Sequence, residues 1–350
     1  MSKVTMNHGA GGTLTFQLVK GYVLKKLGGS PFEVPLEALD DAAVVNGVVL
    51  KSDSHTVKPL FFPGGDIGRL AVSGTVNDIA MLGAEPLALA AGMVLEEGLP
   101  LADLERVLAS MKNTCQEAGV WIVTGDTKVV EKGSLGGMVI NTSGIGRRCE
   151  ALEHNLAVVK RFRPNLEARW LLDSNLRPGD KIIVSGTVGD HGVALLSFRE
   201  GYGFGYELKS DVAPLNKLTL KLMEEAGGIV AMKDPTRGGL ATSLNEWAEK
   251  SGVSILIREE AIPIREGVKA ACEMLGIDPL EVGNEGKAVI GVVPEKAEEV
   301  LEVLRSHPQG REARIIGEAT RDHEGVIIET QIGGRRLLPP PLGDPVPRIC

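Results

Sequence analysis

Aspartate residues stand in five segments of the sequence, at positions from which their side chains could reach a common cleft. Most of them border a short apolar run that is typical of a strand, and one lies inside an apolar segment with helical spacing. Carboxylate oxygens are the ligands that Mg²⁺ prefers, and protein-bound Mg²⁺ usually carries nucleotide phosphates. The acids expected to build such a site are Asp40, Asp41, Asp53, Asp78, Asp126 and Asp234.

Asp78 is the most informative member of this set. It follows Asn77 within residues 66–82, where apolar residues such as Ile67 and Ile79 recur at helical spacing. A carboxylate inside an apolar stretch is costly unless it has a partner, and a metal ion is such a partner. The alternative for any single aspartate is an exposed helical side chain, but the set as a whole favours a metal site.

Two glycine-rich segments could bring backbone N–H groups close to phosphate. A Walker motif of the form G-x-x-x-x-G-K-S/T does not occur in the sequence, so a nucleotide would have to be held in another way. The segments are residues 7–13 and 234–240, and Arg237 in the second could add a bidentate contact to phosphate. A turn that leads into a helix explains the glycines of the second segment equally well.

The four cysteines do not form the CxxC pairs that are typical of zinc sites. Cys115, Cys149 and Cys272 lie among apolar or small residues, and we expect them to be buried, unreactive thiols. Cys350 differs because it is the last residue, at a position where chains are usually exposed. Its tail, residues 338–350, is rich in proline, which excludes helix and gives a reach on the order of 35 Å. The tail can therefore carry a reactive thiol to a distant site.

An α/β framework must position these residues. In the first half, strand-like runs at 48–50, 121–123 and 137–140 alternate with helical segments. One predicted helix covers residues 101–118, with Gly119 as its C-terminal cap. The apolar stripe of this helix, which we expect in the core, consists of Leu101, Leu104, Leu108, Met111 and Cys115.

The composition of the sequence changes across residues 147–180, where Arg, Asn and Pro cluster before a turn signal, and we place the predicted domain boundary there. Strands are then expected near 181–185, 229–233, 253–258, 287–293 and 313–331, and helices near 191–199, 214–226, 239–250, 265–275 and 295–306. The prediction is an α/β (α+β) fold with an N-terminal ATP-binding and dimerisation domain over 1–172. A C-terminal α/β domain over 173–337 and the tail over 338–350 complete it.

Composition excludes several classes of protein. With 350 residues and 43% hydrophobic content, the chain is long enough for two packed domains. A net charge of −8 and a pI near 5.5 do not suit a protein that binds nucleic acid by neutralising phosphates. No apolar run reaches the roughly 18 residues of a membrane-spanning helix, and no basic-then-apolar leader stands at the N-terminus. We expect a soluble, cytoplasmic protein.

Three motifs resemble those of the superfamily of aminoimidazole ribonucleotide synthetase, thiamine monophosphate kinase and selenophosphate synthetase. They are residues 40–43 (Asp-Asp-Ala-Ala), 77–86 (Asn-Asp-Ile-Ala-Met-Leu-Gly-Ala-Glu-Pro) and 234–239 (Asp-Pro-Thr-Arg-Gly-Gly). Within that superfamily, the tail motif Pro-Arg-Ile-Cys at 347–350, with residues 189–192 and 283–287, is similar to the HypE family of hydrogenase maturation proteins. The match spans nearly the whole chain, although the stretch 149–175 looks longer than is usual.

The resemblance implies an ATP-dependent carbamoyl dehydratase, which converts an S-carboxamide on Cys350 to an S-cyanide (thiocyanate) that supplies cyanide ligands to the iron of nickel–iron hydrogenase. It implies a homodimer whose N-terminal domains together form a β-barrel with flanking helices, with ATP at the interface. The implied partners are a carbamoyltransferase that loads Cys350 and an iron-bearing scaffold complex that accepts cyanide. By matching motifs, the implied Mg²⁺ ligands are Asp40, Asp41, Asp78 and Asp234, and the implied nucleotide-binding residues are Asp53, Asp126 and Thr127.

The implied reaction needs a base and a cation. Oxygen is a poor leaving group from the S-carboxamide, so ATP would phosphorylate it and a base would remove the nitrogen protons before elimination. Glu285 and Lys128, in loops or at strand ends near matched motifs, are the candidates for the base and the charge-stabilising cation. A turn residue and a surface cation are the alternatives. His191 is expected to start a helix rather than to act in catalysis.

Two other functions fit parts of the sequence. A small-molecule kinase of the same fold, of the thiamine monophosphate kinase or selenophosphate synthetase type, would have no use for a proline-rich tail that ends in cysteine. A nucleotide-binding scaffold would present the tail to a partner as a docking peptide. ATP turnover separates the scaffold from an enzyme, and a covalent adduct on Cys350 separates the kinase from the dehydratase.

Overall fold

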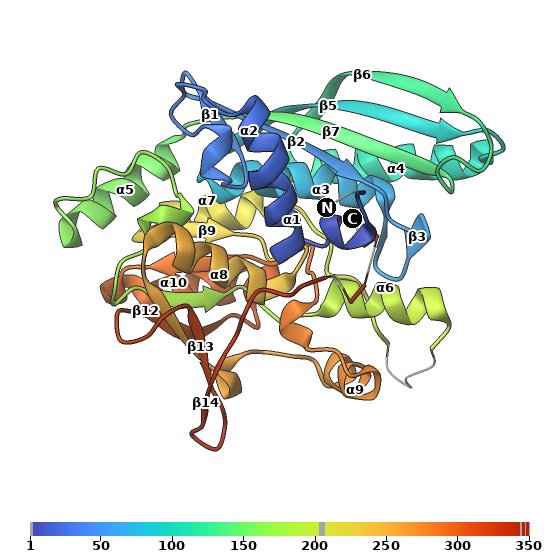
Figure 1. Cartoon of the computed structure of the whole chain (residues 1–350). Coiled ribbons are helices and arrows are strands. Elements are labelled where there is room, and N and C mark those ends of the chain that lie inside the picture. The colour runs from blue at the N-terminus through green and yellow to red at the C-terminus, as the bar shows by residue number, and fades with distance from the viewer. Residues whose placement is uncertain (1–2, 203–206, 344, 347, 350) are drawn as a thin grey trace.

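Two β-sheets, each packed against helices, organise the chain (Figure 1). The computed structural model describes residues 3–202, 207–343, 345–346 and 348–349. Helices and strands alternate along most of the sequence, which confirms the predicted α/β (α+β) class. Within these described ranges, no helix combines the length and the apolar character that crossing a membrane requires.

The first sheet has five strands in the order β1-β2-β7-β5-β6. They are β1 (Ala43–Val45), β2 (Val48–His55), β5 (Glu85–Glu96), β6 (Trp121–Val130) and β7 (Met138–Arg147). β7 pairs antiparallel with β2 and β5, whereas β5 and β6 run parallel because the helix α4 (Leu101–Ala118) crosses between them. β5 escapes sequence-based prediction because alanine and glycine have weak strand propensity. The short strands β3 (Phe61–Phe62) and β4 (Gly65–Asp66) form a separate hairpin.

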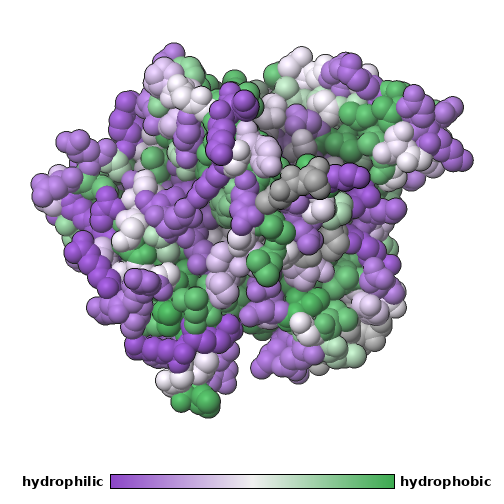
Figure 2. Space-filling model, viewed as in Figure 1, coloured by the Kyte–Doolittle hydropathy of each residue, from purple (hydrophilic) through white to green (hydrophobic). Residues whose placement is uncertain are grey.

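One face of the first sheet is covered and the other is open. The helices α3 (Ile67–Met81) and α4 lie along one face (Figure 1). In β7, residues 138, 140, 142, 144 and 146 alternate as buried positions toward these helices. Hydrophobic residues reach the surface in the region of this sheet, at the upper right of Figure 2. The open face and the edge strand β6 expose Val48, Leu50, Leu87, Trp121, Val123, Val129 and Ile145.

α3 is the buried helix that carries Asp78. The Asp66 side chain caps its N-terminus by accepting hydrogen bonds from the backbone N–H groups of Gly68 and Arg69, at 2.8 and 3.0 Å. Of its 15 residues, 14 are buried, because the sheet and α4 enclose it. The predicted helix within 66–82 is therefore confirmed, and Asp78 does not face open water.

α4 begins and ends where the sequence predicts, but its buried face differs. Gly119 ends it with a φ of 77°, a left-handed conformation that suits glycine. Leu101 and Leu108 are exposed, which corrects their assignment to the core. On the helical wheel these two leucines fall on the flank of the face that meets α3. The buried residues are Val107, Met111, Thr114, Cys115 and Ala118.

The second sheet has seven strands in the order β14-β13-β10-β12-β8-β11-β9. They are β8 (Lys181–Val184), β9 (Ile229–Lys233), β10 (Ser254–Arg258), β11 (Val289–Val292), β12 (Arg314–Thr320), β13 (Val326–Glu329) and β14 (Arg335–Leu337). Its helices are α6 (Asp190–Glu200), α7 (Asn216–Glu225), α8 (Gly239–Ser251), α9 (Glu266–Leu275) and α10 (Ala297–Ser306). α7 and α10 pack on one face of the sheet and α8 on the other. The predicted alternation of strands and helices beyond residue 180 is confirmed.

Residues 149–175 tie the two sheets together. Their helix α5 (Glu150–Phe162) packs against α7 and β9. Asn155 exchanges two hydrogen bonds of 2.8 Å with the backbone of Ile229, one from its Nδ2 and one to its Oδ1. Arg163 forms an ion pair with the buried Asp180. Residues 149–175 therefore hold the chain that follows β7, the last strand of the first sheet, against the second sheet and its helix α7.

The tail packs on the protein instead of extending into solvent. Its described residues form neither helix nor strand after β14, as the prolines predict. In Figure 1 the tail, in dark red, runs back toward α1 (Thr13–Leu18) and α6. Val346 and Ile349 are buried in the core beneath the first sheet, which corrects the expectation of an exposed tail for these residues. Cys350 lies outside the described residues.

Candidate active site

Three aspartates from distant segments, two of them buried and Asp41 half-buried, meet where the two sheets adjoin; we call Asp41, Asp78 and Asp234 the acidic triad. Asp41 precedes β1, Asp78 lies in α3, and Asp234 directly follows β9. One carboxylate oxygen of each lies within 4.8 Å of the other two. They line a cavity of about 360 Å³ that α1 borders. Three of the four predicted metal-binding residues are thus brought together.

The negative charge of the acidic triad is partly compensated by two lysines. Lys51 Nζ lies 2.8 Å from Asp78 Oδ2, and Lys233 Nζ lies 2.6 Å from Asp41 Oδ1. Burial, with the neighbouring carboxylates adding to it, nevertheless raises the pKa of Asp78 to about 7 and that of Asp234 well above its usual range. Convergent carboxylate oxygens fit a hard divalent cation such as Mg²⁺, and a bound cation would favour their ionised forms.

Asp40 borders the same cavity but stands outside the acidic triad. Its Oδ1 accepts a hydrogen bond from the backbone N–H of Asp173 at 3.1 Å and lies 3.8 Å from Lys250 Nζ. Burial, followed by repulsion from the Asp173 carboxylate, raises the pKa of Asp40 to about 7. Its assignment as a metal ligand stays a prediction.

The two glycine-rich segments meet beside the acidic triad. Gly11 has a φ of 79°, and a Cβ at this position would lie 2.4 Å from the Arg237 carbonyl oxygen, so a larger residue would separate the segments. Arg237 Nη1 donates a hydrogen bond to the Gly9 carbonyl at 3.1 Å. The pKa of Asp53, in β2, is lowered. Burial acts to raise this pKa, but nearby basic side chains, including Arg237, outweigh burial. Of the predicted nucleotide-binding residues, Arg237 lines the cavity, and Asp53 lies on β2 two positions from Lys51, which also lines it.

Asp126, Thr127 and Lys128 do not reach this cavity within one chain. They lie on the exposed edge strand β6, where Asp126 Oδ2 is 3.6 Å from Lys128 Nζ. β7 and β5 separate β6 from β2, which carries Asp53. Three strand spacings amount to roughly 14 Å. A single chain therefore leaves these three residues apart from the acids with which they are predicted to act.

Glu285 has the surroundings of a residue that can hold a proton. Its side chain is buried, and its Oε1 has no hydrogen-bond partner among the described residues. Burial raises the pKa of Glu285 well above its usual range, and the Asp234 and Asp211 carboxylates add to the rise. Its backbone N–H donates to Asp211 Oδ1 at 3.1 Å, and its carbonyl accepts from Asn77 Nδ2 at 3.4 Å. These two bonds hold Glu285 beside the α3 residue that precedes Asp78.

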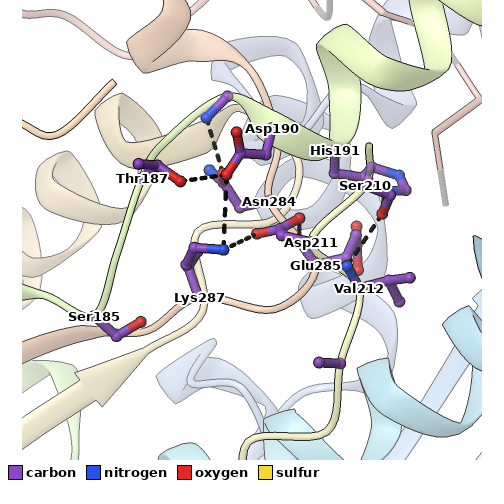
Figure 3. A network of polar contacts seen from close by, with 12 residues as sticks. Ser185, Thr187, Asp190, His191, Ser210, Asp211, Val212, Asn284, Glu285 and Lys287 are labelled. Carbon is purple, nitrogen blue, oxygen red and sulfur yellow. Dashed lines mark hydrogen bonds and ion pairs between the residues drawn. The ribbon is translucent and has the colours of Figure 1, made fainter. Parts of the chain in front are cut away.

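A second group of buried charges supports the Glu285 loop (Figure 3); we call Asp190, Asp211 and Lys287 the lysine cluster. Lys287 Nζ lies 3.0 Å from Asp211 Oδ2 and 3.8 Å from Asp190 Oδ2. The Thr187 hydroxyl donates to the Asp190 carboxylate. Burial opposes ionisation of Asp211, but Lys287, His191 and the hydrogen bonds to Asp211 together outweigh burial and lower the pKa of Asp211. The cluster thus has the paired charges of a supporting structure.

Several residues of the site were not found by sequence reasoning. Lys51 and Lys233 lie on strands next to the expected acids, and Lys233 ends a run of buried apolar residues, which is a usable signal for a buried ion pair. Lys287 lies within the glycine-rich motif at 283–287, but without an assigned role. Asp211 lies in a segment without any motif, so its role became visible through its contacts alone.

The tail ends against the Glu285 loop. Ile349 is buried, and a Cβ at Gly283 would lie 2.7 Å from Ile349 Cδ1. His191 Nε2 donates a hydrogen bond to the Ile349 carbonyl at 2.9 Å. His191 stands in the first turn of α6, so the expectation that it starts a helix is confirmed, and it also holds the tail. Cys350 follows Ile349 directly in the sequence.

Comparisons with known proteins agree with this arrangement. Residues 39–148 match the N-terminal domain, and residues 177–329 the C-terminal domain, of AIR synthase related protein. The chain is 50% identical to a putative hydrogenase expression/formation protein of Methanocaldococcus jannaschii, over 99% of this chain and 100% of that protein. It is 47% identical to carbamoyl dehydratase HypE of Azotobacter vinelandii, over 99% of this chain and 97% of that protein.

Solved structures give the same result. A crystal structure of a HypE–HypF complex is similar with a TM-score of 0.83 and 46% identity, covering 93% of this chain and 99% of the other. A crystal structure of HypE in complex with ATP is similar with a TM-score of 0.79 and 43% identity, covering 99% of this chain and 100% of the other. Similarity at this level along the whole chain shows that the protein belongs to the HypE family of carbamoyl dehydratases.

Proposed function

We propose that this chain is an ATP-dependent carbamoyl dehydratase that converts an S-carboxamide on Cys350 to an S-cyanide during hydrogenase maturation. The observation that carries the proposal is the place of Ile349, the residue before Cys350. It is buried against the loop that contains Glu285, whose buried Oε1 has no partner among the described residues. Relatives that are carbamoyl dehydratases, and a relative solved with ATP, support the same reaction.

The acidic triad would hold Mg²⁺, which supplies neutralisation of the ATP phosphates when it is bound. Three carboxylates with Lys51 and Lys233 carry a net charge of about −1 when all are ionised. Because Asp40, Glu246 and Arg237 also line the cavity, its five carboxylates and three basic groups carry about −2 when ionised, and a divalent cation would neutralise them. Arg237 and the glycine-rich residues 7–13 adjoin the cavity and offer a guanidinium and backbone N–H groups to phosphate.

Every bond and proton of the proposed reaction can be accounted for with Cys350, the carbamoyl donor, ATP and a base. Carbamoylation forms a C–S bond at Cys350, releases the thiol proton and breaks the bond between the carbamoyl group and its donor. In the dehydration, the carboxamide oxygen attacks the γ-phosphorus of ATP, ADP leaves, and one N–H proton goes to a base. Loss of the second N–H proton expels phosphate and leaves the C≡N bond. Glu285 is placed near the end of the tail, and when it is ionised its raised pKa makes its carboxylate a stronger base for these protons.

The proposal includes a homodimer in which two copies share each site. The open face of the first sheet and the edge strand β6 expose apolar side chains, and an unpaired edge strand is a common place for association. Two such sheets packed together would give the β-barrel that the resemblance implies. β6 of one copy would then bring Asp126, Thr127 and Lys128 to the cavity of the other, with Lys128 as the cation that stabilises developing charge.

Two partners follow from the reaction. A carbamoyltransferase must load Cys350, and the complex of a relative with HypF supports a partner of that type. An iron-bearing scaffold complex must accept the cyanide, because the S-cyanide is a carrier rather than an end product. Both partners need access to Cys350, so the tail must leave its packed position during each cycle.

The test follows the mass of the intact chain. With the carbamoyltransferase and carbamoyl donor present, we expect one carbamoyl group per chain, confined to the C-terminal peptide. Addition of ATP and Mg²⁺ should convert that adduct to one lighter by a single water. Cys350→Ala should abolish both products, and Cys115→Ala is the matched control, because Cys115 is a buried thiol far from the tail in sequence.

The result separates the proposed reaction from the two alternatives. A small-molecule kinase would hydrolyse or transfer phosphate from ATP without forming an adduct. A docking scaffold would form neither the adduct nor the dehydrated product. Retention of the adduct in Cys350→Ala, with its loss in Cys115→Ala, would overturn the assignment of Cys350.

A further inference from the structure

Three hydrogen bonds hold the backbone carbonyls of the last two described residues of the tail. His191 Nε2 donates to the Ile349 carbonyl at 2.9 Å, and the side chain of His191 is fully buried. The Arg348 carbonyl accepts from the Lys58 backbone N–H at 3.4 Å and from Arg199 Nη2 at 3.2 Å. Of these three donors, His191 reaches furthest toward Cys350, because it binds the carbonyl of the preceding residue.

The surroundings of His191 fix the direction of its ring. A carbonyl oxygen accepts and does not donate, so Nε2 must carry the proton in the bond to Ile349. Nδ1 lies 2.7 Å from Ser210 Oγ, and the ring meets Phe62 edge-on at a centroid distance of 5.5 Å. The Ser210 oxygen in turn accepts from the Val212 backbone N–H at 3.1 Å. The ring is therefore positioned before the tail arrives.

The same short segment also positions Glu285. Asp211, next to Ser210 in the sequence, accepts the backbone N–H of Glu285 at 3.1 Å and is paired with Lys287 at 3.0 Å. Residues 210 and 211 thus hold the histidine that binds the tail and the loop that carries the proposed base. The distance between the tail and Glu285 is consequently set by one rigid segment.

The backbone of Arg348 shows that the tail is held rather than loosely placed. Its φ of 60° lies in the left-handed region, which costs a residue with a side chain free energy unless its surroundings fix it. Burial of Ile349 and the three hydrogen bonds supply that constraint. The turn directs the chain toward the Gly283 loop instead of toward solvent.

We propose that His191 is a positioning residue of the reaction: its Nε2–H, oriented by Ser210, seats the tail by the Ile349 carbonyl and so fixes where the thiol of residue 350 meets the site. The catalytic consequence rests on the proposed function, whereas the seating of the tail does not. His191 takes no part in the bond changes, and another side chain with a donor at the same place should replace it.

The first experiment measures seating without any activity. Trypsin cleaves the bond between Arg348 and Ile349 when the tail is released, and the loss of two residues is followed by intact mass. His191→Phe keeps a ring but removes both nitrogens, and we expect cleavage roughly tenfold faster, the factor that one hydrogen bond typically provides. His191→Gln retains a donor and should stay near the parent rate. Ser210→Ala should fall between them.

His154→Phe is the matched control. Its Nδ1 also binds a backbone carbonyl, that of Met223, at 2.8 Å, but in the contact between α5 and α7. The control should leave cleavage at Arg348 unchanged. If His191→Phe does not fold, Ser210→Ala against His154→Phe carries the same comparison.

The second experiment measures dehydration in a single turnover of chain already loaded with the carbamoyl group. His191→Phe should slow this step about tenfold with the KM for ATP unchanged, and His191→Gln should restore it. Cleavage of His191→Phe at the parent rate would overturn the seating role. Faster cleavage with an unchanged dehydration rate would overturn the catalytic consequence. If the parent chain seats its tail but forms no S-cyanide, the proposed function fails and the seating role stands.

Discussion

The two charge clusters of this protein adjoin the same Glu285 loop but arrange their carboxylates and lysines differently. In the acidic triad, three carboxylates converge and burial raises the pKa of Asp78 to about 7. In the lysine cluster, Lys287 lies between two carboxylates, and it lowers the pKa of Asp211 although burial still raises that of Asp190. In one cluster three carboxylates lie within 4.8 Å of one another and two of them also contact a lysine, whereas in the other a lysine lies between two carboxylates.

The difference separates a binding site from its support. Like charges held together weaken a fold, so we expect a cation to compensate the convergent carboxylates of the acidic triad in the working state. Paired and hydrogen-bonded charges need no ligand, and removal of one partner leaves the other buried and uncompensated. Substitutions in the acidic triad should therefore change binding, and those in the lysine cluster should change stability.

The largest effect is expected for Asp78→Asn, which removes one carboxylate from the acidic triad. Affinity for ATP with Mg²⁺ should fall on the order of 1,000-fold, or about 4 kcal/mol, as measured by calorimetry. The free energy of unfolding without ligand should change by less than about 1 kcal/mol, because the relief of like-charge repulsion offsets the loss of the ion pair between Asp78 and Lys51. Asp322→Asn, at an exposed position, controls for loss of one charge. Unchanged affinity would show that the acidic triad is not the metal site.

Asp211→Asn should instead destabilise the fold by about 3 kcal/mol, because Lys287 loses its close partner in a buried place. Urea unfolding measures the change, and the folded fraction should still bind ATP. The double variant Asp211→Leu with Lys287→Met is the matched control, since it removes both charges together. It should regain most of the lost stability, and a double variant as unstable as Asp211→Asn would show that the pairing is unimportant.

Mixed dimers test whether two copies complete each site. Asp78→Asn alone and Lys128→Ala alone should each lack dehydratase activity. Mixing equal amounts of the two chains should restore about a quarter of the parent activity, because half of the dimers are mixed and each has one intact site. Light scattering of the parent chain serves as the control for dimer formation. No recovery in mixed dimers would place Lys128 outside the shared site.

The smallest effect is expected for Asp40→Asn. Asparagine retains the oxygen that accepts the Asp173 N–H, and Asp40 stands outside the acidic triad. Affinity for ATP with Mg²⁺ should therefore fall by less than about tenfold, whereas Asp41→Asn should resemble Asp78→Asn. Calorimetry under the same conditions measures both affinities. Equal losses of affinity for Asp40→Asn and Asp41→Asn would add Asp40 to the metal site.

Local patterns determined much of the fold. The apolar spacing within 66–82 predicted α3, Gly119 predicted the end of α4, and the alternation beyond residue 180 predicted the elements of the second sheet. The prolines after residue 338 predicted a tail without helix. Such features depend on residues a few positions apart, which is why periodicity and turn chemistry suffice to find them.

Residue types and motifs in the sequence also marked the glycine-rich segments and four candidate metal ligands, of which the structure groups Asp41, Asp78 and Asp234 and leaves Asp40 outside. Only the tertiary structure decided that Lys51 and Lys233 share the charge of these acids, that Asp211 supports Glu285, and that Ile349 packs against His191. It also left Asp126 and Lys128 on an open edge of the chain. These outcomes depend on contacts between residues far apart in the sequence and on burial, which changes the free energy of a charge in a way that no local pattern encodes.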